Sequence, residues 1–187
     1  MGTRINYLLL LVGNRGTGKT TTALQVAEKT GKAVIVINTD RHPAYADFDV
    51  VTVDELKKWK GKKCVVFVQD EDEVNQAADI LNKYQANAVV IFEDAQKYIN
   101  ENISKPILRL IINHRMRNFD LLFMFHFLKH VPPKIACNYN ILFLFKTTDG
   151  AVNLASKYGN WQSINARRDR INKHKDVHYC EVIRDNE

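Results

Sequence analysis

One segment constrains this chain more than any other, namely Gly13-Asn14-Arg15-Gly16-Thr17-Gly18-Lys19-Thr20. It matches the pattern G-x-x-x-x-G-K-[ST] at every position. The glycines let the backbone turn tightly, so that successive N–H groups can point inward at phosphate oxygens. An apolar run precedes the loop, and a helical pattern follows it with its positive dipole end toward the loop. The segment therefore predicts a phosphate-binding turn between a strand and a helix.

Within this loop, Lys19 is expected to reach the β- and γ-phosphates of a nucleotide as a mobile charge. Thr20 is expected to offer its hydroxyl to Mg²⁺. ATP is the expected nucleotide, because no N/T-K-x-D-like guanine motif is visible in the sequence. The residues predicted to bind the nucleotide are those of the loop and the next position: Gly13, Asn14, Arg15, Gly16, Thr17, Gly18, Lys19, Thr20 and Thr21.

The rest of the chain alternates short apolar runs with longer periodic stretches. Most of the runs are continuous in Val, Ile, Leu or Phe, as strands buried on both faces are. Predicted strands are Asn6–Val12, Ala33–Asn38, Cys64–Val68, Ala88–Phe92, Leu121–His126, Ile141–Lys146 and His178–Ile183, and predicted helices are Lys19–Thr30, Asp72–Tyr84 and Pro106–Asn118. Alternation of this kind predicts a three-layer α/β sandwich with a mostly parallel sheet.

Length and composition agree with a globular fold. The 187 residues predict a single domain over 1–187, which includes a basic C-terminal segment at 151–187. The net charge of +6 permits a polyanionic partner without requiring one. No apolar run is long enough to cross a bilayer, so we expect no membrane segment and a cytoplasmic location. Cys64 and Cys180 lie in predicted strands and are expected to be buried free thiols.

An acidic pair follows one of the predicted strands. In parallel sheets, ligands bind outside the carboxyl ends of the strands, and Glu93 and Asp94 come directly after Ala88–Phe92. Nucleotide hydrolysis needs one carboxylate near the metal and usually another that orients water. We assign Glu93 to the metal, with Thr20, and Asp94 to the water. The rival cluster Asp70-Glu71-Asp72-Glu73 reads better as the start of a helix.

These residues resemble a known group of proteins. Glu93-Asp94-Ala95-Gln96 is similar to the D-E-A-Q segment of Zot-like proteins in the FtsK–HerA superfamily of P-loop ATPases. The segment from His114 to Asp120 resembles that group's arginine-containing stretch, and Val131-Pro132-Pro133-Lys134 resembles a later one. The similarity covers roughly Leu8 to Lys146. It implies a RecA-like (ASCE) P-loop NTPase fold. The order Glu93-Asp94 reverses the commoner Asp-Glu, which leaves the division of roles between the two acids open.

The resemblance also implies roles for two more residues. Arg115 matches the position of an arginine finger that reaches a neighbouring subunit's γ-phosphate. The alternative is an arginine that covers the core edge or favours a helix C-terminus. His126 ends a predicted strand where the family places a polar sensor, often glutamine. The alternative is a histidine satisfied by backbone. With Asp94, Glu93 and His126, Arg115 completes the predicted catalytic set.

Members of that superfamily are typically ring-forming, often hexameric, motors that move DNA. The resemblance therefore implies an ATP-hydrolysing motor that packages or translocates double-stranded DNA without sequence specificity. It also implies a homo-oligomeric ring, a viral portal or capsid protein as a further partner, and a location in the host cytoplasm or the virion. The alternatives are a Zot-like extrusion ATPase with another cargo, a small-molecule kinase, and a module that only binds ATP.

A DNA-binding surface is harder to assign. One candidate is the basic stretch with Trp161 and Tyr158 nearby, which contains Arg167, Arg168, Arg170, Lys173 and Lys175. The other is Lys57–Lys63. A basic helix segment is more often a solvated face than a nucleic-acid site, and Asp169 interrupts the first one. Any DNA contact is expected to use backbone phosphates.

Overall fold

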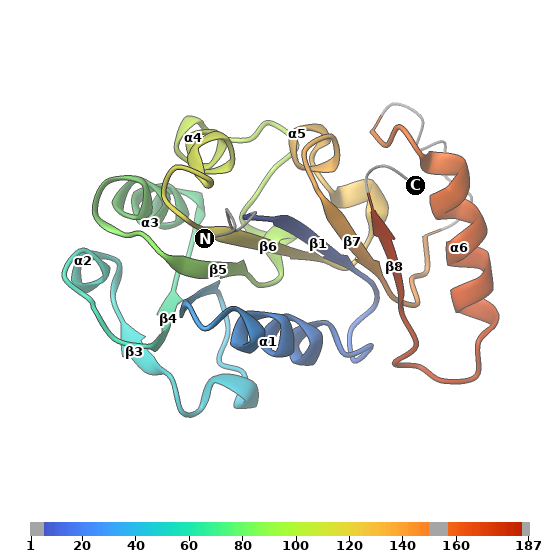
Figure 1. The fold of residues 1–187 in the computed structure, drawn as a ribbon, viewed down its shortest axis with the longest axis horizontal. Helices are drawn as coiled ribbons and strands as arrows, with labels where there is room; N and C mark the ends of the chain where they lie inside the picture. Colours follow the sequence, from blue (N-terminus) through green and yellow to red (C-terminus); the bar gives the residue numbers. More distant parts are fainter. Residues whose placement is uncertain (1–5, 150–156, 185–187) are drawn as a thin grey trace, which may run out of the picture.

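The eight strands in the described part of the chain form one sheet in the order β3-β4-β2-β5-β6-β1-β7-β8. The computed structural model describes residues 6–149 and 157–184 (Figure 1). The strands are β1 (Leu8–Val12), β2 (Ala33–Asn38), β3 (Asp49–Val51), β4 (Lys63–Phe67), β5 (Ala88–Phe92), β6 (Asp120–Phe125), β7 (Ile141–Leu144) and β8 (Glu181–Arg184). Every pairing is parallel except that of β7 with β8.

Helices cover both faces of the sheet. They are α1 (Lys19–Thr30), α2 (Val53–Leu56), α3 (Glu71–Tyr84), α4 (Lys105–Asn113), α5 (Pro133–Ala136) and α6 (Trp161–Lys173), with short 3-10 helices at Pro43–Tyr45, Ala95–Lys97 and Leu128–His130. Figure 1 shows α1 on one face, α3, α4 and α5 on the other, and α6 beside β8. This confirms the predicted RecA-like three-layer α/β sandwich.

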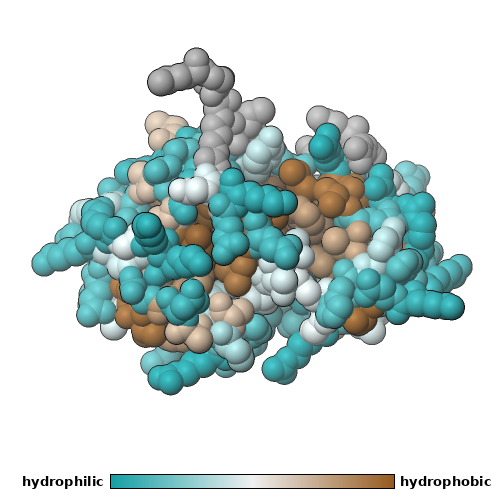
Figure 2. All heavy atoms as spheres, turned by 60° about the horizontal axis from the view of Figure 1, so that its bottom comes forward, coloured by the Kyte–Doolittle hydropathy of each residue, from teal (hydrophilic) through white to brown (hydrophobic). Residues whose placement is uncertain are grey.

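The hydrophobic core has two parts, one on each face of the sheet, because helices bury both faces. Alternate residues of β1 face opposite ways: Leu8 and Leu10 belong to the larger cluster under α3 and α4, while Leu9 and Leu11 pack toward α1. Figure 2, which brings the α1 side forward, shows apolar side chains still visible between hydrophilic ones on this face. The partly buried apolar residues packed against the α1 cluster include Leu24, Val26, Ile141 and Phe143. The continuous apolar strands are therefore central ones, as predicted.

Several predicted boundaries were wrong. The first strand begins at Leu8 rather than Asn6, and the last is Glu181–Arg184 rather than His178–Ile183. β6 ends at Phe125 and β7 ends at Leu144, so the strands stop before His126 and Lys146. These ends lie beside the polar site, where residues of the adjoining loops bond to the backbone. For example, the Gln96 side chain accepts the N–H of His126.

The largest boundary error concerns α4, which ends at Asn113 and not at Asn118. The His114 ring bonds to the carbonyl of Ile111, and the N–H of Phe119 donates to the carbonyl of His114. These bonds replace the helical pattern with a tight turn. Arg115 therefore does not extend the apolar stripe of the helix. It lies in the exposed turn before β6.

The surroundings of the two cysteines agree only partly with the prediction. Cys64 is buried in β4, and burial raises the pKa of its thiol to about 12. Cys180 is half-buried and precedes β8 instead of lying in it.

Across residues 6–149 and 157–184, no helix has the length and apolar character needed to cross a membrane.

Candidate nucleotide-binding site

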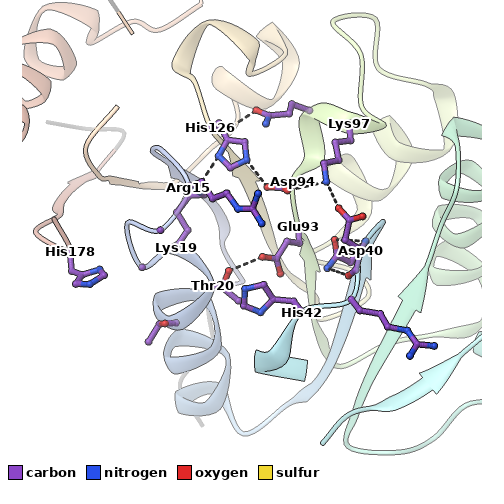
Figure 3. A pocket seen from close by; sticks show the side chains of 16 residues that line it. Arg15, Lys19, Thr20, Asp40, His42, Glu93, Asp94, Lys97, His126 and His178 are labelled. Atoms are coloured by element: carbon purple, nitrogen blue, oxygen red, sulfur yellow. Dashed lines mark hydrogen bonds and ion pairs between the residues drawn. The ribbon is translucent and has the colours of Figure 1, made fainter. Parts of the chain in front are cut away.

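A polar pocket of about 460 Å³ lies at the carboxyl ends of the central strands (Figure 3). Residues after β1, β2, β5 and β6 meet there, as the rule for parallel sheets requires. Its wall consists of Arg15, Gly16, Gly18, Lys19, Thr20, Thr21, Asn38, Asp40, Arg41, His42, Glu93, Asp94, Gln96, Lys97, His126 and His178. Of the predicted nucleotide-binding residues, Gly13, Asn14 and Thr17 lie behind this wall and support the loop.

The glycines of the loop are needed for two different physical reasons. Gly16 and Gly18 have φ values of 77° and 95°, a left-handed conformation that side chains strain. Gly13 instead has no room, because a Cβ there would lie 2.5 Å from the Cβ of Phe145. The loop is also tied internally, since the Thr17 hydroxyl donates to the carbonyl of Asn14 at 2.8 Å. The backbone N–H groups are thus held in a fixed turn at the start of α1.

Lys19 is buried at the base of the pocket, although it carries a charge. Its Nζ donates to the carbonyls of Gly13 and Asn14 at 2.7 and 2.9 Å. Burial lowers the pKa of Lys19 to about 8, and the negative charges of Asp94 and Glu93 oppose this only in part. A bound polyphosphate would favour the charged form again. Lys19 is therefore poised to gain charge stabilisation when an anion enters.

Glu93 is buried beside the hydroxyl of Thr20. The Thr20 Oγ1 donates to Glu93 Oε1 at 2.7 Å, and the hydroxyl of Tyr45 bonds to the other carboxylate oxygen. Burial raises the pKa of Glu93, against the Thr20 hydrogen bond and the charge of His42. Two oxygen ligands of the kind that Mg²⁺ prefers thus lie together in this pocket, so these side chains fit the metal that nucleotide chemistry requires.

Asp94 faces the open part of the pocket. Its backbone is left-handed, with φ 47°, which is unfavourable for a residue other than glycine and typical of functional sites. Its two carboxylate oxygens have different partners: Oδ1 lies 3.0 Å from Nε2 of His126, and Oδ2 lies 3.3 Å from Nζ of Lys97. Lys97 also bonds to Asp40, so it joins the end of β2 to the end of β5.

His126 lies between the phosphate loop and Asp94, because β6 separates β1 from β5 in the sheet. Its Nδ1 is 3.3 Å from the ammonium of Lys19. Burial, and then the charge of Lys19, lowers the pKa of His126 despite the opposing charge of Asp94. A neutral ring fits this geometry, with Nε2–H donating to Asp94 and Nδ1 accepting from Lys19. The predicted sensor thus contacts both the loop and the acidic pair.

Sequence reasoning missed several residues of the wall. Asn38 is the last residue of β2, and Asp40, Arg41 and His42 follow soon after it, so the rule that located Glu93 would have located them too. Gln96 was part of the segment that carries the family resemblance but was given no role, and Lys97 had no sequence signal. His178 had none either, because its position beside Gly18 depends on the antiparallel return of β8; its Nδ1 would lie 3.4 Å from a Cβ on Gly18.

Other predicted residues lie away from the pocket. Asp70 caps α3, where its side chain accepts the N–H of Glu73 at 2.9 Å, as the helix-start interpretation requires. Arg115 lies just before the amino end of β6, whereas the pocket lies at the carboxyl ends of the strands. β6 has six residues, so at ~3.3 Å per residue its two ends are about 20 Å apart.

The basic C-terminal stretch is divided between arginines in structural contacts and the exposed lysines Lys173 and Lys175. Arg168 is 4% exposed and bonds to Asp169 and Asn165. Arg170 forms two hydrogen bonds with Glu181. Tyr158, which was expected near a DNA surface, is buried. Parts of the expected basic segment, residues 151–156 and 185–187, lie outside the described residues.

Comparison with known proteins agrees with this geometry. A model of the family described as "ATPase family associated with various cellular activities (AAA)" matches residues 9–124, more than half of the chain. The chain belongs to the AAA family of ATPases. No curated protein matches the sequence.

Solved structures of similar fold extend over nearly the whole chain of this ATPase. The genome packaging NTPase B204 of Sulfolobus turreted icosahedral virus 2, in complex with ATP-gammaS, has a TM-score of 0.75 at 16% identity and covers 97% of this chain and 93% of its own. The DNA-packaging ATPase B204 of Sulfolobus Turreted Icosahedral Virus gives 0.72 at 15%, covering 96% and 93%. VirB4 of Thermoanaerobacter pseudethanolicus gives 0.63 at 10%, covering 98% and 90%. These neighbours confirm the predicted fold over nearly the whole chain.

Proposed function

We propose that this ATPase is a motor that uses ATP hydrolysis to package or translocate double-stranded DNA. The observation that carries the proposal is the convergence of Lys19, Thr20, Glu93, Asp94 and His126 on one pocket. The fold of packaging ATPases, found over nearly the full length of the chain, supports the choice of cargo. DNA is bound through its phosphates in this proposal, since no base-reading module was recognised in the sequence.

In the proposed reaction, water attacks the γ-phosphorus and the bond to the ADP oxygen breaks. The loop N–H groups and Lys19 hold the phosphates. Thr20 and Glu93 would hold Mg²⁺, which would supply the positive charge that neutralises developing phosphate charge. Asp94 orients the water and accepts its proton, because it is the carboxylate that faces the open pocket. His126 bonds to the terminal phosphate or the attacking water, since it contacts both Lys19 and Asp94.

Arg115 acts in this proposal on a neighbouring subunit. It is exposed and about 20 Å from its own pocket, by the length of β6. It therefore cannot reach its own nucleotide, whereas the corresponding turn of a second copy can approach the open pocket. An arginine delivered in trans stabilises transition-state charge and can be worth about 10³-fold or more in rate. This arrangement requires a homo-oligomer, and we propose a ring, typically hexameric. The ring would work with a viral portal or capsid protein, in the host cytoplasm or the virion.

The decisive experiment is DNA-stimulated ATP hydrolysis. Purified protein should hydrolyse ATP faster when duplex DNA of unrelated sequences is added, and the stimulation should fall steeply with salt. Light scattering should give an assembly near six times 21.6 kDa. A rate that DNA leaves unchanged, with a chain that stays monomeric in ATP, would contradict the motor. Stimulation by a protein cargo alone would favour an extrusion ATPase, and phosphate transfer to a nucleoside monophosphate would favour a kinase.

A further inference from the structure

The turn that carries Arg115 combines an exposed tip with a firmly held backbone. Met116 is 87% exposed, and Ile112 at the end of α4 is 67% exposed. Arginine is among the residues that most often dominate the binding energy of contact surfaces, and here exposed apolar side chains flank it. A surface turn of no consequence would have few constraints on its main chain.

Residues from three other parts of the chain bind this turn. The Asn6 side-chain amide donates to the carbonyl of Arg115 at 3.2 Å. The N–H of Asn87 donates to the carbonyl of Arg117 at 2.9 Å, and Lys32 Nζ donates to the carbonyl of Asn118 at 2.8 Å. The carbonyls on both sides of Met116 are therefore held by groups distant in sequence.

A buried ion pair anchors these contacts. Lys32 Nζ lies 2.8 Å from Asp120 Oδ2, and their side chains are 2% and 5% exposed. Lys32 also donates to Asn6 Oδ1 at 2.9 Å, and the N–H of Tyr7 donates to Asp120 Oδ1 at 2.9 Å. A buried pair of this kind is a poor source of stability, because desolvation offsets most of the attraction. Its directional bonds instead fix the main chain.

We propose that Asn6, Lys32 and Asp120 are positioning residues that hold Arg115 for insertion into the pocket of a neighbouring copy. This inference rests on the proposed function, in which Arg115 acts in trans. Lys32 directly follows Gly31, the cap of α1, and the other end of α1 is the phosphate loop. The start of α1 therefore contacts the subunit's own nucleotide. Lys32, just beyond the end of α1, orients the Arg115 that enters the pocket of the next subunit.

Asn6→Asp tests the proposal with the smallest change. It keeps the oxygen that accepts from Lys32 and removes the donor to the Arg115 carbonyl. We expect turnover of the pure variant to fall on the order of 10–100-fold, as for a displaced catalytic group. Binding of a non-hydrolysable ATP analogue should stay within about two-fold, because the variant's own pocket is intact.

Mixing experiments separate positioning from general damage. Lys19→Ala subunits lack a working pocket but keep the Arg115 turn. Mixed with Arg115→Ala subunits, they should restore turnover, since each intact pocket then meets an intact arginine. Asn6→Asp subunits should be rescued by Lys19→Ala subunits in the same way. A variant damaged in its own pocket or fold would not be rescued.

The outcomes are distinguishable. If Arg115→Ala is not rescued, the trans arginine of the proposed function is wrong. If Arg115→Ala is rescued but Asn6→Asp is not, or if Asn6→Asp keeps full turnover, the positioning role is overturned. Gln85→Glu is the matched control, because Gln85 is a buried amide that donates to the carbonyls of Leu56 and Trp59, away from Arg115. It should keep its turnover.

A second variant covers the case in which Asn6→Asp does not fold. Lys32→Met combined with Asp120→Leu replaces the pair by apolar side chains, a change that is often neutral for stability. It removes the bonds from Lys32 to Asn118 and Asn6, and the bond from the N–H of Tyr7 to Asp120. The double variant should therefore fold, lose turnover alone, and regain it with Lys19→Ala subunits. Full turnover of the double variant alone would contradict the proposal.

Discussion

At the scale of single residues, the adjacent acids Glu93 and Asp94 have opposite surroundings. Glu93 is buried between the hydroxyls of Thr20 and Tyr45, and Asp94 turns outward through a left-handed backbone. A burial difference between neighbouring carboxylates separates their chemistry, and Asp94, with a 26% exposed side chain against 8% exposure of Glu93, is the more accessible to water. This supports Glu93 near the metal and Asp94 at the water, despite the reversed order of the two acids.

Asp94→Asn should therefore abolish turnover while it spares nucleotide binding. The amide keeps the size of the side chain but cannot accept a proton, so we expect a loss of about 10²-fold or more in kcat. Titration with a fluorescent ATP analogue should give a Kd within a few-fold of the original protein. Glu93→Gln is the comparison, and it should weaken Mg²⁺-dependent binding. Equal turnover of Asp94→Asn and the original protein would refute the assignment.

Lys19 gives a pH-dependent prediction. Its pKa in the free pocket is about 8, below the ordinary 10.5, so its charge is lost as pH rises through about 8. A bound phosphate stabilises the charged form and raises that pKa, so binding takes up protons and ATP affinity falls above pH 8. Calorimetry in buffers of different ionisation enthalpy measures this uptake. In Lys19→Arg, whose guanidinium stays charged, the uptake should vanish. Its persistence would point to another group.

The sequence predicted most of the pocket because the rule for strand ends is local. The phosphate loop, Glu93, Asp94 and His126 each follow an apolar run directly, and the structure brings all of them together. Lys97 and His178 could not be predicted this way. Lys97 reaches the site through the short 3-10 helix at Ala95–Lys97, and His178 reaches it through the return of an edge strand.

At the scale of elements, the capping of α3 can be tested separately from catalysis. The Asp70 side chain accepts the N–H of Glu73, so Asp70→Ala should lower the free energy of unfolding by about 1 kcal/mol. Urea denaturation measures the loss, and the ATPase rate should not change. Asp72→Ala, in the first turn of the same helix, should cost less because Asp72 is not the capping residue. Loss of ATPase activity in Asp70→Ala would favour the alternative hypothesis, in which the cluster from Asp70 to Glu73 supplies the catalytic carboxylates.

Element boundaries were predicted less well where contacts distant in sequence decide them. The helix at α4 was predicted to continue past Asn113 to Asn118, yet the bonds of Asn6, Lys32 and Asn87 to residues 115–118 favour a turn. β3 was not predicted, because a three-residue edge strand has little sequence signal of its own. Pairing with β4 creates it.

At the scale of the whole molecule, stability depends on the centre of the sheet. The rings of Phe92 and Phe123 stack 4.7 Å apart across β5 and β6. Phe123 is fully buried, so Phe123→Ala should cost about 3–5 kcal/mol, measured by urea denaturation. Met116→Ala is the control, because that side chain is 87% exposed and its loss should stay within about 0.5 kcal/mol. Similar losses for both variants would contradict the location of the core.

The position of Arg115 at the amino ends of the strands, with the pocket at their carboxyl ends, restricts how copies can associate. A two-fold, isologous contact presents the same patch on both partners, and these two features share no patch. Contact between them must be heterologous, head to tail, and an open chain of copies then leaves one Arg115 turn and one pocket unpaired until it closes on itself. The angle between neighbours, rather than any count encoded in one subunit, would fix the number of copies.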